Sequence, residues 1–221
     1  MKRIFISLLL SLHLHAEHQG LLVVFCGISG SGKSTIACNI AKHFQADAFL
    51  EPEADEWPSC HDDFSSLVTI RSIRTALLWK AWETKTRGNI AFVDTYYDKL
   101  HYYYLDKSGM EWLIHPKDAY FPIAKQLADL DHKTLPQADL LVWIDVEYEE
   151  WINRLTKRNR IQDHKAHFQE TYLFQKQHLF DAVTTFAQAY HIPLITIHNT
   201  QGDMDNVLHH LIQKLQPFLT Q

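Results

Sequence analysis

Two kinds of hydrophobic pattern follow one another along this chain. Residues 21–26 form an almost continuous apolar run, LLVVFC, which is typical of a strand covered on both faces in a parallel sheet. From Lys33 to Phe44 the apolar residues recur at helical spacing, which predicts an amphipathic helix. A glycine-rich turn separates the two segments, so the patterned part of the chain begins as strand, turn and helix.

The same alternation continues toward the C-terminus. Further strands are predicted near residues 46–50, 89–93, 140–144 and 193–197, and further helices over about 62–87, from about 147, through 186 and from about 204. The segment between the third and fourth strands is mixed and rich in tyrosine. Strands that alternate with helices predict a three-layer α/β domain, with helices on both sides of a parallel sheet of about five strands.

Composition narrows the class of protein. The chain has 221 residues, 46% of them hydrophobic, which suits one domain with a sizeable core. Only seven Gly and seven Pro are present, so we expect one domain over residues 20–221 rather than domains joined by a linker. The net charge of −5 argues against nucleic acid as a partner, because phosphate contacts need a basic face. Three cysteines without a pattern indicate free thiols and a reducing, cytoplasmic location.

The N-terminal segment, residues 1–19, has a different character. Lys2-Arg3, the apolar run 4–12 and a small residue at Ala16 resemble a short secretory signal. An upstream start codon, or an apolar arm that packs on the domain, explains the same residues. The run is too short to span a bilayer as a helix, so we expect no membrane anchor.

The turn after the first strand carries the strongest motif. Residues 27–34, GISGSGKS, match G-x-x-x-x-G-K-[ST] in full, between a predicted strand and a predicted helix. Glycines let backbone N–H groups turn toward phosphate oxygens, and the helix N-terminus adds to the attraction. We expect Lys33 to contact the β- and γ-phosphates and Ser34 to bind Mg²⁺. The expected ATP-binding residues here are Gly27, Ser29, Gly30, Ser31, Gly32, Lys33, Ser34 and Thr35.

Carboxylates follow the other predicted strands. Glu51-Pro52-Glu53 comes after the second strand, Asp94 after the third and Asp145 after the fourth. Ligands of open α/β sheets bind outside the carboxyl ends of the strands. There one carboxylate can accept the proton of an attacking hydroxyl while another holds Mg²⁺. Glu51 is the candidate base, Asp94 is a candidate for metal and substrate, Glu53 for substrate, and Asp145 could instead cap a helix.

Two groups of arginines complete the candidate site. Arg71 and Arg74 fall in the middle of the apolar face of the long helix, where guanidinium groups are almost never buried unpaired. They either pair with Glu53 or Asp94 or hold the substrate. After the fourth strand come Arg154, Arg158 and Arg160, which we interpret as a mobile basic lid over the ATP phosphates, the alternative being a solvated helix end.

Together these residues resemble the deoxyribonucleoside kinases. The resemblance covers about residues 20–200 and rests on the loop 27–35, Glu51-Pro52 with Trp57, Asp94, and Ile144-Asp145-Val146 leading into the arginines from Arg154 to Arg160. It implies a P-loop kinase that transfers the γ-phosphate of ATP to the 5′-hydroxyl of a deoxynucleoside. In that reading Glu51 is the general base, Trp57 a wall of the nucleoside pocket, and Arg158 and Arg160 the lid cations. It also implies a homodimer formed through the long helices.

The chain departs from that family after the third strand. The usual Glu-Arg-Ser or Asp-Arg-Ser is replaced by Asp94-Thr95-Tyr96-Tyr97, so Arg71 or Arg74 would have to replace the missing arginine. The Asp94-x-Tyr96 spacing is similar to the Asp-Arg-Tyr of thymidylate kinases, and Tyr96 becomes a candidate substrate contact. Two alternatives follow: a nucleoside monophosphate kinase, or a degenerate NTP-binding switch. A kinase exported from the cell would lose its ATP, which favours the cytoplasmic location.

Overall fold

The computed structural model describes residues 20–52, 56, 60, 62–111, 113–158, 168–200 and 203–219. The proposed signal segment 1–19 and the candidate site residues Glu53, Trp57 and Arg160 lie outside this part of the chain. None of the helices within it is long and apolar enough to cross a membrane. The secondary structure comprises β1 (Leu21–Cys26), α2 (Lys33–Phe44), β2 (Asp47–Phe49), α3 (Asp63–Thr86), β3 (Ile90–Val93), α4 (Tyr97–Tyr104), α5 (Phe121–Thr134), β4 (Leu140–Asp145), α6 (Tyr148–Arg158), α7 (Phe168–Ala189), β5 (Leu194–His198) and α8 (Met204–Leu219).

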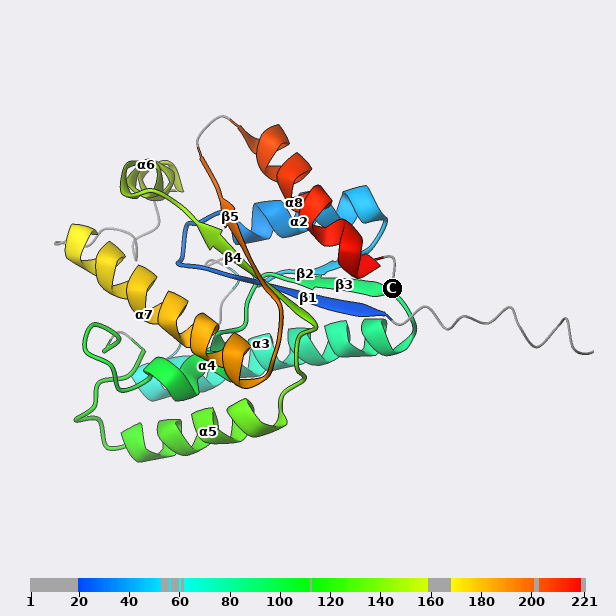
Figure 1. The fold of residues 1–221 in the computed structure, drawn as a ribbon. Coiled ribbons are helices and arrows are strands. Elements are labelled where there is room, and N and C mark those ends of the chain that lie inside the picture. The colour runs from blue at the N-terminus through cyan, green and yellow to red at the C-terminus, as the bar shows by residue number, and fades with distance from the viewer. Residues whose placement is uncertain are drawn as a thin grey trace, which may run out of the picture.

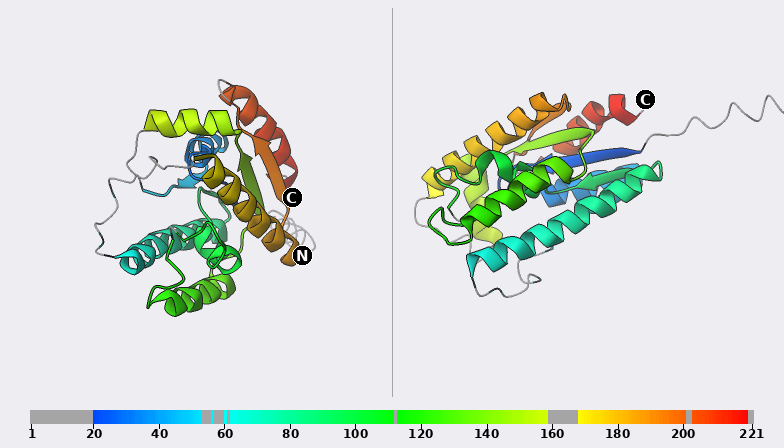
Figure 2. Two further views of the ribbon diagram at one scale, coloured as in Figure 1. Left: turned by 90° about the vertical axis from the view of Figure 1, so that its left-hand side faces the viewer. Right: turned by 90° about the horizontal axis from the view of Figure 1, so that it is seen from below.

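The five strands form one parallel sheet in the order β2-β3-β1-β4-β5. In Figure 1, α2 and α8 lie on one side of the sheet, and α3, α4, α5 and α7 lie on the other. The view from below in Figure 2 shows the second group of helices side by side across the sheet. The three-layer α/β fold with a five-stranded parallel sheet, expected from the pattern of elements, is confirmed.

The continuous apolar run of β1 is explained by two separate cores. Leu22 and Val24 face the core beneath α3, α4, α5 and α7, whereas Val23 and Phe25 face the core beneath α2 and α8. All four side chains are completely buried. Because successive side chains of a strand point to opposite faces, only a strand covered on both faces is apolar at every position.

The tyrosine-rich segment contains two helices, α4 and α5, that hydrophobic periodicity did not reveal. The reason is visible in α4, where Asp98, Lys99 and His101 are all buried. Polar residues at core positions remove the apolar period on which sequence prediction depends. The buried Lys99 ammonium donates to the carbonyls of His132 and Leu135 at the end of α5, which satisfies helix carbonyls that would otherwise lack partners.

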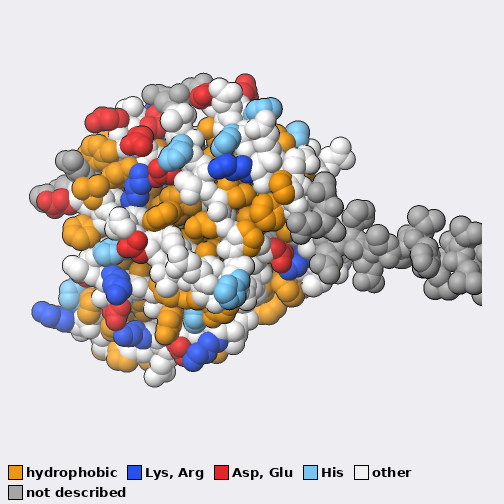
Figure 3. All heavy atoms as spheres, in the orientation of Figure 1, with side chains coloured by type: hydrophobic (Ala, Val, Ile, Leu, Met, Phe, Trp, Pro, Cys, Tyr) orange, Lys and Arg blue, Asp and Glu red, His pale blue; other side chains and the backbone are white. Residues whose placement is uncertain are grey.

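On the face of the molecule shown in Figure 3, acidic and basic side chains are interspersed with hydrophobic ones. The carboxyl edge of the sheet is where β1 passes into α2, and where β2, β3, β4 and β5 end.

Candidate active site

The phosphate loop lies between β1 and α2, as predicted. Gly32 has φ of +93°, and a Cβ there would lie 2.5 Å from Nδ2 of Asn199, so both the backbone angle and the space require glycine. Inside the loop the Ser31 hydroxyl oxygen is buried and makes no hydrogen bond. The Lys33 ammonium donates to the carbonyls of Gly27 and Ile28, both at 2.9 Å.

The electrostatics of this loop suit an anion. Burial lowers the pKa of Lys33, and the carboxylates of Asp94 and Glu51 act in the opposite direction. A buried ammonium and an orphaned hydroxyl inside a glycine-rich turn are groups that a phosphate would satisfy. The residues therefore fit the triphosphate of ATP.

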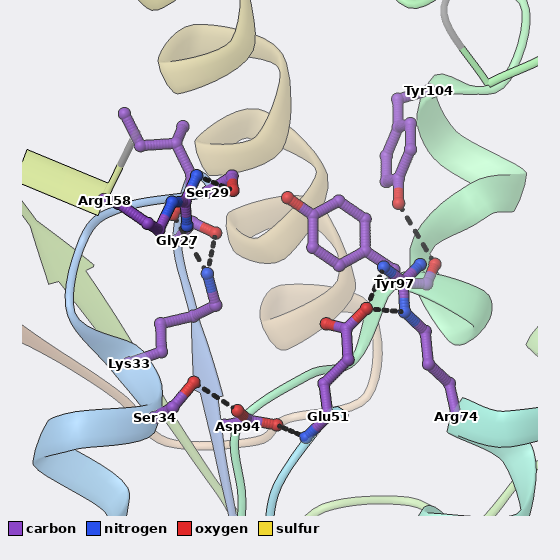
Figure 4. A network of polar contacts seen from close by, with 11 residues as sticks. Gly27, Ser29, Lys33, Ser34, Glu51, Arg74, Asp94, Tyr97, Tyr104 and Arg158 are labelled. Atoms are coloured by element: carbon purple, nitrogen blue, oxygen red, sulfur yellow. Dashed lines mark hydrogen bonds and ion pairs between the residues drawn. The ribbon is translucent and has the colours of Figure 1, made fainter. Parts of the chain in front are cut away.

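Asp94 connects three elements of the site (Figure 4). Its Oδ2 accepts a hydrogen bond from the Ser34 hydroxyl at the start of α2, and its Oδ1 accepts one from the Glu51 backbone N–H at 2.9 Å. Burial raises the pKa of Asp94, while these two hydrogen bonds and Lys33 oppose the rise. Ser34 and Asp94, the two expected Mg²⁺ ligands, are thus in direct contact. A hydroxyl and a carboxylate are oxygen ligands of the kind that Mg²⁺ prefers, so they fit that ion, which takes its remaining ligands from phosphates and water.

Glu51 and Arg74 form an ion pair at the neighbouring edge. Arg74 donates from Nη2 to Oε1 of Glu51 at 2.7 Å, and its guanidinium carbon lies 4.8 Å from the centre of the Tyr97 ring. Figure 4 shows Arg74, Tyr97 and Glu51 together, with Glu51 between them and the Asp94 carboxylate. Arg74 therefore forms an ion pair with the candidate base Glu51, whereas Glu53, one of the partners expected from the sequence, lies outside the described residues.

Arg71, one turn earlier on α3, has a different environment. It donates to both carboxylate oxygens of Asp131 on α5, at 2.5 and 2.6 Å. This side-by-side geometry is the strongest form of an arginine–carboxylate contact. The two arginines that the sequence placed on one helix face thus hold different partners, and the contacts of Arg71 with Asp131 bind α3 to α5.

Two titratable groups of α4 are buried against these ion pairs. Burial raises the pKa of Asp98 to about 7; Arg74 and Arg71 counteract this rise, and Asp131 and Glu51 add to it. Burial lowers the pKa of His101 to about 3, assisted by the positive charges of Arg74 and Arg71. One carboxylate oxygen of Asp98 and Nε2 of His101 are buried without hydrogen-bond partners.

Tyr96 is more deeply packed than expected for a substrate contact. Its hydroxyl donates to the Pro136 carbonyl and accepts from the Ala138 N–H, both at 3.1 Å, and its ring packs against Phe186. Only 3% of the residue is exposed. Tyr97, which sequence reasoning passed over, is the tyrosine that faces Arg74. Its position four residues after the end of β3 was the available signal, but six tyrosines lie in the segment between β3 and β4, and the sequence does not distinguish them.

A small cavity, partly open to solvent, lies beside the phosphate loop. It is lined by Phe25, Cys26, Gly27, Lys33, Thr95, Tyr96, Tyr97, Leu100, Trp143, Leu179 and Val183. Lys33 and the start of α4 thus border the same space. Asp145, by contrast, forms a 2.6 Å ion pair with Lys176 of α7.

The arginines of α6 lie against the phosphate loop. Arg154 donates to the Ser31 carbonyl at 2.9 Å, and Arg158 to the Ser29 hydroxyl at 3.3 Å. Asn199, immediately after β5, also donates to the Ser31 carbonyl. Asn199 was not predicted, although the rule that polar residues at strand ends build the site would have found it. The remaining lid residue, Arg160, lies outside the described chain.

A parallel sheet of this strand order, with a glycine-rich phosphate loop between its central strand and the following helix, defines the P-loop kinase fold. No protein-family model and no curated protein matches the sequence. Solved structures are similar in fold. The thymidylate kinase of Candida albicans superposes with a TM-score of 0.62 at 16% identity, covering 90% of this chain and 92% of the other.

Two further structures show the same likeness. The deoxyadenosine kinase of M. mycoides with bound dATP has a TM-score of 0.63 at 16% identity, covering 89% of this chain and 100% of the other. The thymidylate kinase of Ehrlichia chaffeensis has a TM-score of 0.52 at 18% identity, covering 89% and 98%. The fold that the sequence resemblance implied, that of the deoxynucleoside and thymidylate kinases, is confirmed.

Proposed function

We propose that this protein is an ATP-dependent kinase that transfers the γ-phosphate to a hydroxyl of an uncharged, nucleoside-type acceptor. The observation that carries the proposal is the position of Glu51. Its carboxylate is held by Arg74 at the carboxyl edge of the sheet, and its backbone is tied to Asp94, which contacts the phosphate-loop residue Ser34. A base is thus anchored beside the loop that would bind the triphosphate.

The chemistry assigns a separate role to each group. The acceptor hydroxyl attacks the γ-phosphorus and forms the new O–P bond, its proton passes to Glu51, and the bond to the bridging oxygen breaks to release ADP. Lys33 neutralises charge on the phosphates, and the loop N–H groups orient them. Ser34 and Asp94 would hold Mg²⁺, which when bound screens the phosphate charge. The main contribution of such a site is positioning and electrostatics.

The charges on the acceptor side favour a neutral acceptor over a nucleoside monophosphate. In the described part of α3, α4 and α5, Arg74 is paired with Glu51 and Arg71 with Asp131. The Asp98 carboxyl lies buried among these pairs. An acceptor phosphate would bring about two negative charges next to three carboxyl groups and two arginines that already have anionic partners. That arrangement is unfavourable in a poorly solvated site.

The test is phosphate transfer from labelled ATP to a panel of nucleosides, the corresponding monophosphates and unrelated alcohols. We expect transfer to at least one nucleoside, with a kcat/KM at least about tenfold above that of its monophosphate. Transfer to monophosphates alone would establish the thymidylate kinase-like alternative, which the Asp94-x-Tyr96 spacing supports. ATP binding without any transfer would instead indicate a nucleotide-binding switch.

A matched pair of lysine variants on α2 provides the control. Lys33→Ala removes the ammonium beside the phosphate loop and is expected to abolish transfer. Lys42→Ala, which changes an exposed lysine near the other end of the same helix, should leave transfer unchanged. Equal loss in both would show that the effect is not specific to the phosphate loop. The homodimer expected from the resemblance stays a prediction, which sedimentation of the purified protein would check.

A further inference from the structure

Side chains from two distant segments hold the outer surface of the phosphate loop. The Ser31 carbonyl accepts hydrogen bonds from Nη1 of Arg154 at 2.9 Å and from Nδ2 of Asn199 at 2.8 Å. The Ser29 carbonyl accepts one from the indole N–H of Trp151 at 2.7 Å. Trp151 and Arg154 are three residues apart on α6 and therefore face the same side of that helix.

The geometry of a phosphate loop explains why these contacts matter. Backbone N–H groups can point inward at a phosphate only if the carbonyls between them point outward. Outward carbonyls that are shielded from water then need hydrogen-bond donors from the protein. Ser29 and Ser31 are alternate residues of the loop, and both carbonyls have such donors. Gly30, between them, packs so closely on α6 that a Cβ would lie 2.8 Å from Leu155.

The Arg154 guanidinium is largely occupied by these protein contacts. Besides Ser31, it donates from Nε to Glu150 and from Nη2 to both the backbone carbonyl and Oδ1 of Asn199, at 3.2 and 3.1 Å. Asn199 is in turn anchored by its backbone N–H, which donates to the Asp145 carbonyl at 2.8 Å. All three guanidinium nitrogens therefore have protein acceptors, and few of their donors remain for a nucleotide.

We propose that Arg154 and Asn199 are positioning residues that hold the phosphate loop in its binding conformation, and that Arg154 is not a cation of the transferred phosphate. This role replaces the lid function that the sequence suggested for Arg154 and leaves that function to the later arginines. The inference rests on the ATP binding in the proposed function but not on the identity of the acceptor. According to this proposal, side chains of α6 and of the residue after β5 set the affinity for ATP. They do not stabilise the charge of the transition state.

The experiment compares Arg154→Gln and Asn199→Asp with Lys157→Gln, which removes an exposed positive charge from the same helix. A lost hydrogen bond to the loop is worth about 1 kcal/mol or somewhat more, so each of the first two should raise the KM for ATP about five- to tenfold. The kcat at saturating ATP and the KM for the acceptor should stay within about twofold. The double variant should lose less than the product of the single effects, because both donors share one carbonyl.

Several outcomes separate this proposal from its rivals. A kcat that falls about 10³-fold in Arg154→Gln with the KM for ATP unchanged would make Arg154 a transition-state cation and overturn the proposal. Arg154→Lys, which keeps one donor for Ser31, should recover part of the ATP affinity if Arg154→Gln folds poorly. If no acceptor is found, calorimetry measures the Kd for ATP of each variant and of the original protein, and the same five- to tenfold ratio is expected. The proposal therefore stays testable even if the proposed kinase activity is wrong. An unchanged ATP affinity in both variants would also overturn the proposal.

Discussion

Arg74 donates two hydrogen bonds to the same oxygen of Glu51, from Nε at 3.1 Å and from Nη2 at 2.7 Å. The second carboxylate oxygen of Glu51 is therefore left to face the space beside Asp94 and Lys33, as Figure 4 shows. An arginine that orients a carboxylate through one oxygen leaves the other available for a proton. Arg74 thus contacts one oxygen of the candidate base Glu51 and the ring of Tyr97.

Glu51→Gln is the direct test of the proposed base. The amide retains an oxygen that can accept from Arg74 but cannot take a proton from the acceptor. We expect transfer to fall by at least about 10²-fold, in line with general-base contributions, while ATP still raises the melting temperature. A variant with full activity would remove Glu51 from the mechanism, and one that no longer binds ATP would show that its role is structural.

Arg74 and Arg71 are expected to respond differently to substitution. Arg74→Ala releases the carboxylate of Glu51 and should lower kcat and raise the KM for the acceptor. Arg71→Ala leaves Asp131, whose side chain is 2% exposed, without its cation, so the main effect should be a loss of about 2–4 kcal/mol in the free energy of unfolding. Urea unfolding and steady-state kinetics measured on both variants separate the two roles. A large change in acceptor KM for Arg71→Ala without destabilisation would contradict this assignment.

The pH dependence of stability should reveal two opposing buried groups. The Asp98 pKa of about 7 lies above the unfolded value of about 4, so its contribution is present at low pH and is lost as pH rises toward 7. The His101 pKa of about 3 lies below the unfolded value of about 6.5, so its contribution is lost as pH falls from 6.5 toward 3. Between about pH 4 and 6.5 the two trends oppose each other.

Substituting one of these two residues should therefore reveal the effect of the other on the pH dependence of stability. In Asp98→Asn the slope of the free energy of unfolding against pH between about 4 and 6.5 should be more positive than in the original protein, by up to about 1.4 kcal/mol per pH unit, because the opposing contribution of Asp98 is gone. In His101→Gln the slope should be more negative than in the original protein over the same interval. Urea unfolding at a series of pH values measures both slopes. Parallel curves for the two variants and the original protein would be inconsistent with these pKa values.

Tyr96→Phe tests whether that residue contacts the substrate. Loss of the hydroxyl leaves the Ala138 N–H and the Pro136 carbonyl without this buried partner, which should cost about 1–3 kcal/mol of unfolding free energy. The KM for the acceptor should be unchanged, because the hydroxyl points between backbone groups of the core. Tyr97→Phe serves as the comparison. A raised acceptor KM at unchanged stability in Tyr96→Phe would restore the role expected from the sequence.

The local pattern of hydrophobic and polar residues predicted the strands and most of the helices, because each of these elements depends on residues that are close together in the sequence. The run 21–26, the motif 27–34 and the helix from Lys33 to Phe44 appear where the spacing placed them. Helix α4 was missed because Asp98, Lys99 and His101 occupy buried positions that a polar residue seldom takes. Their burial depends on the charges and carbonyls that α3 and α5 bring to them, which no window of sequence contains.

The sequence alone determined the phosphate loop, the parallel α/β architecture and the carboxylates at the strand ends, since these follow from local spacing and from the rule that strand ends meet at one edge. Tertiary structure decided which charges meet. Arg74 pairs with Glu51, Arg71 with Asp131, and Arg154 with Asn199 and the phosphate loop, across 23 to 123 positions of chain. The physical reason is that an ion pair depends on distance in space, and helix periodicity specifies only which face a charge occupies.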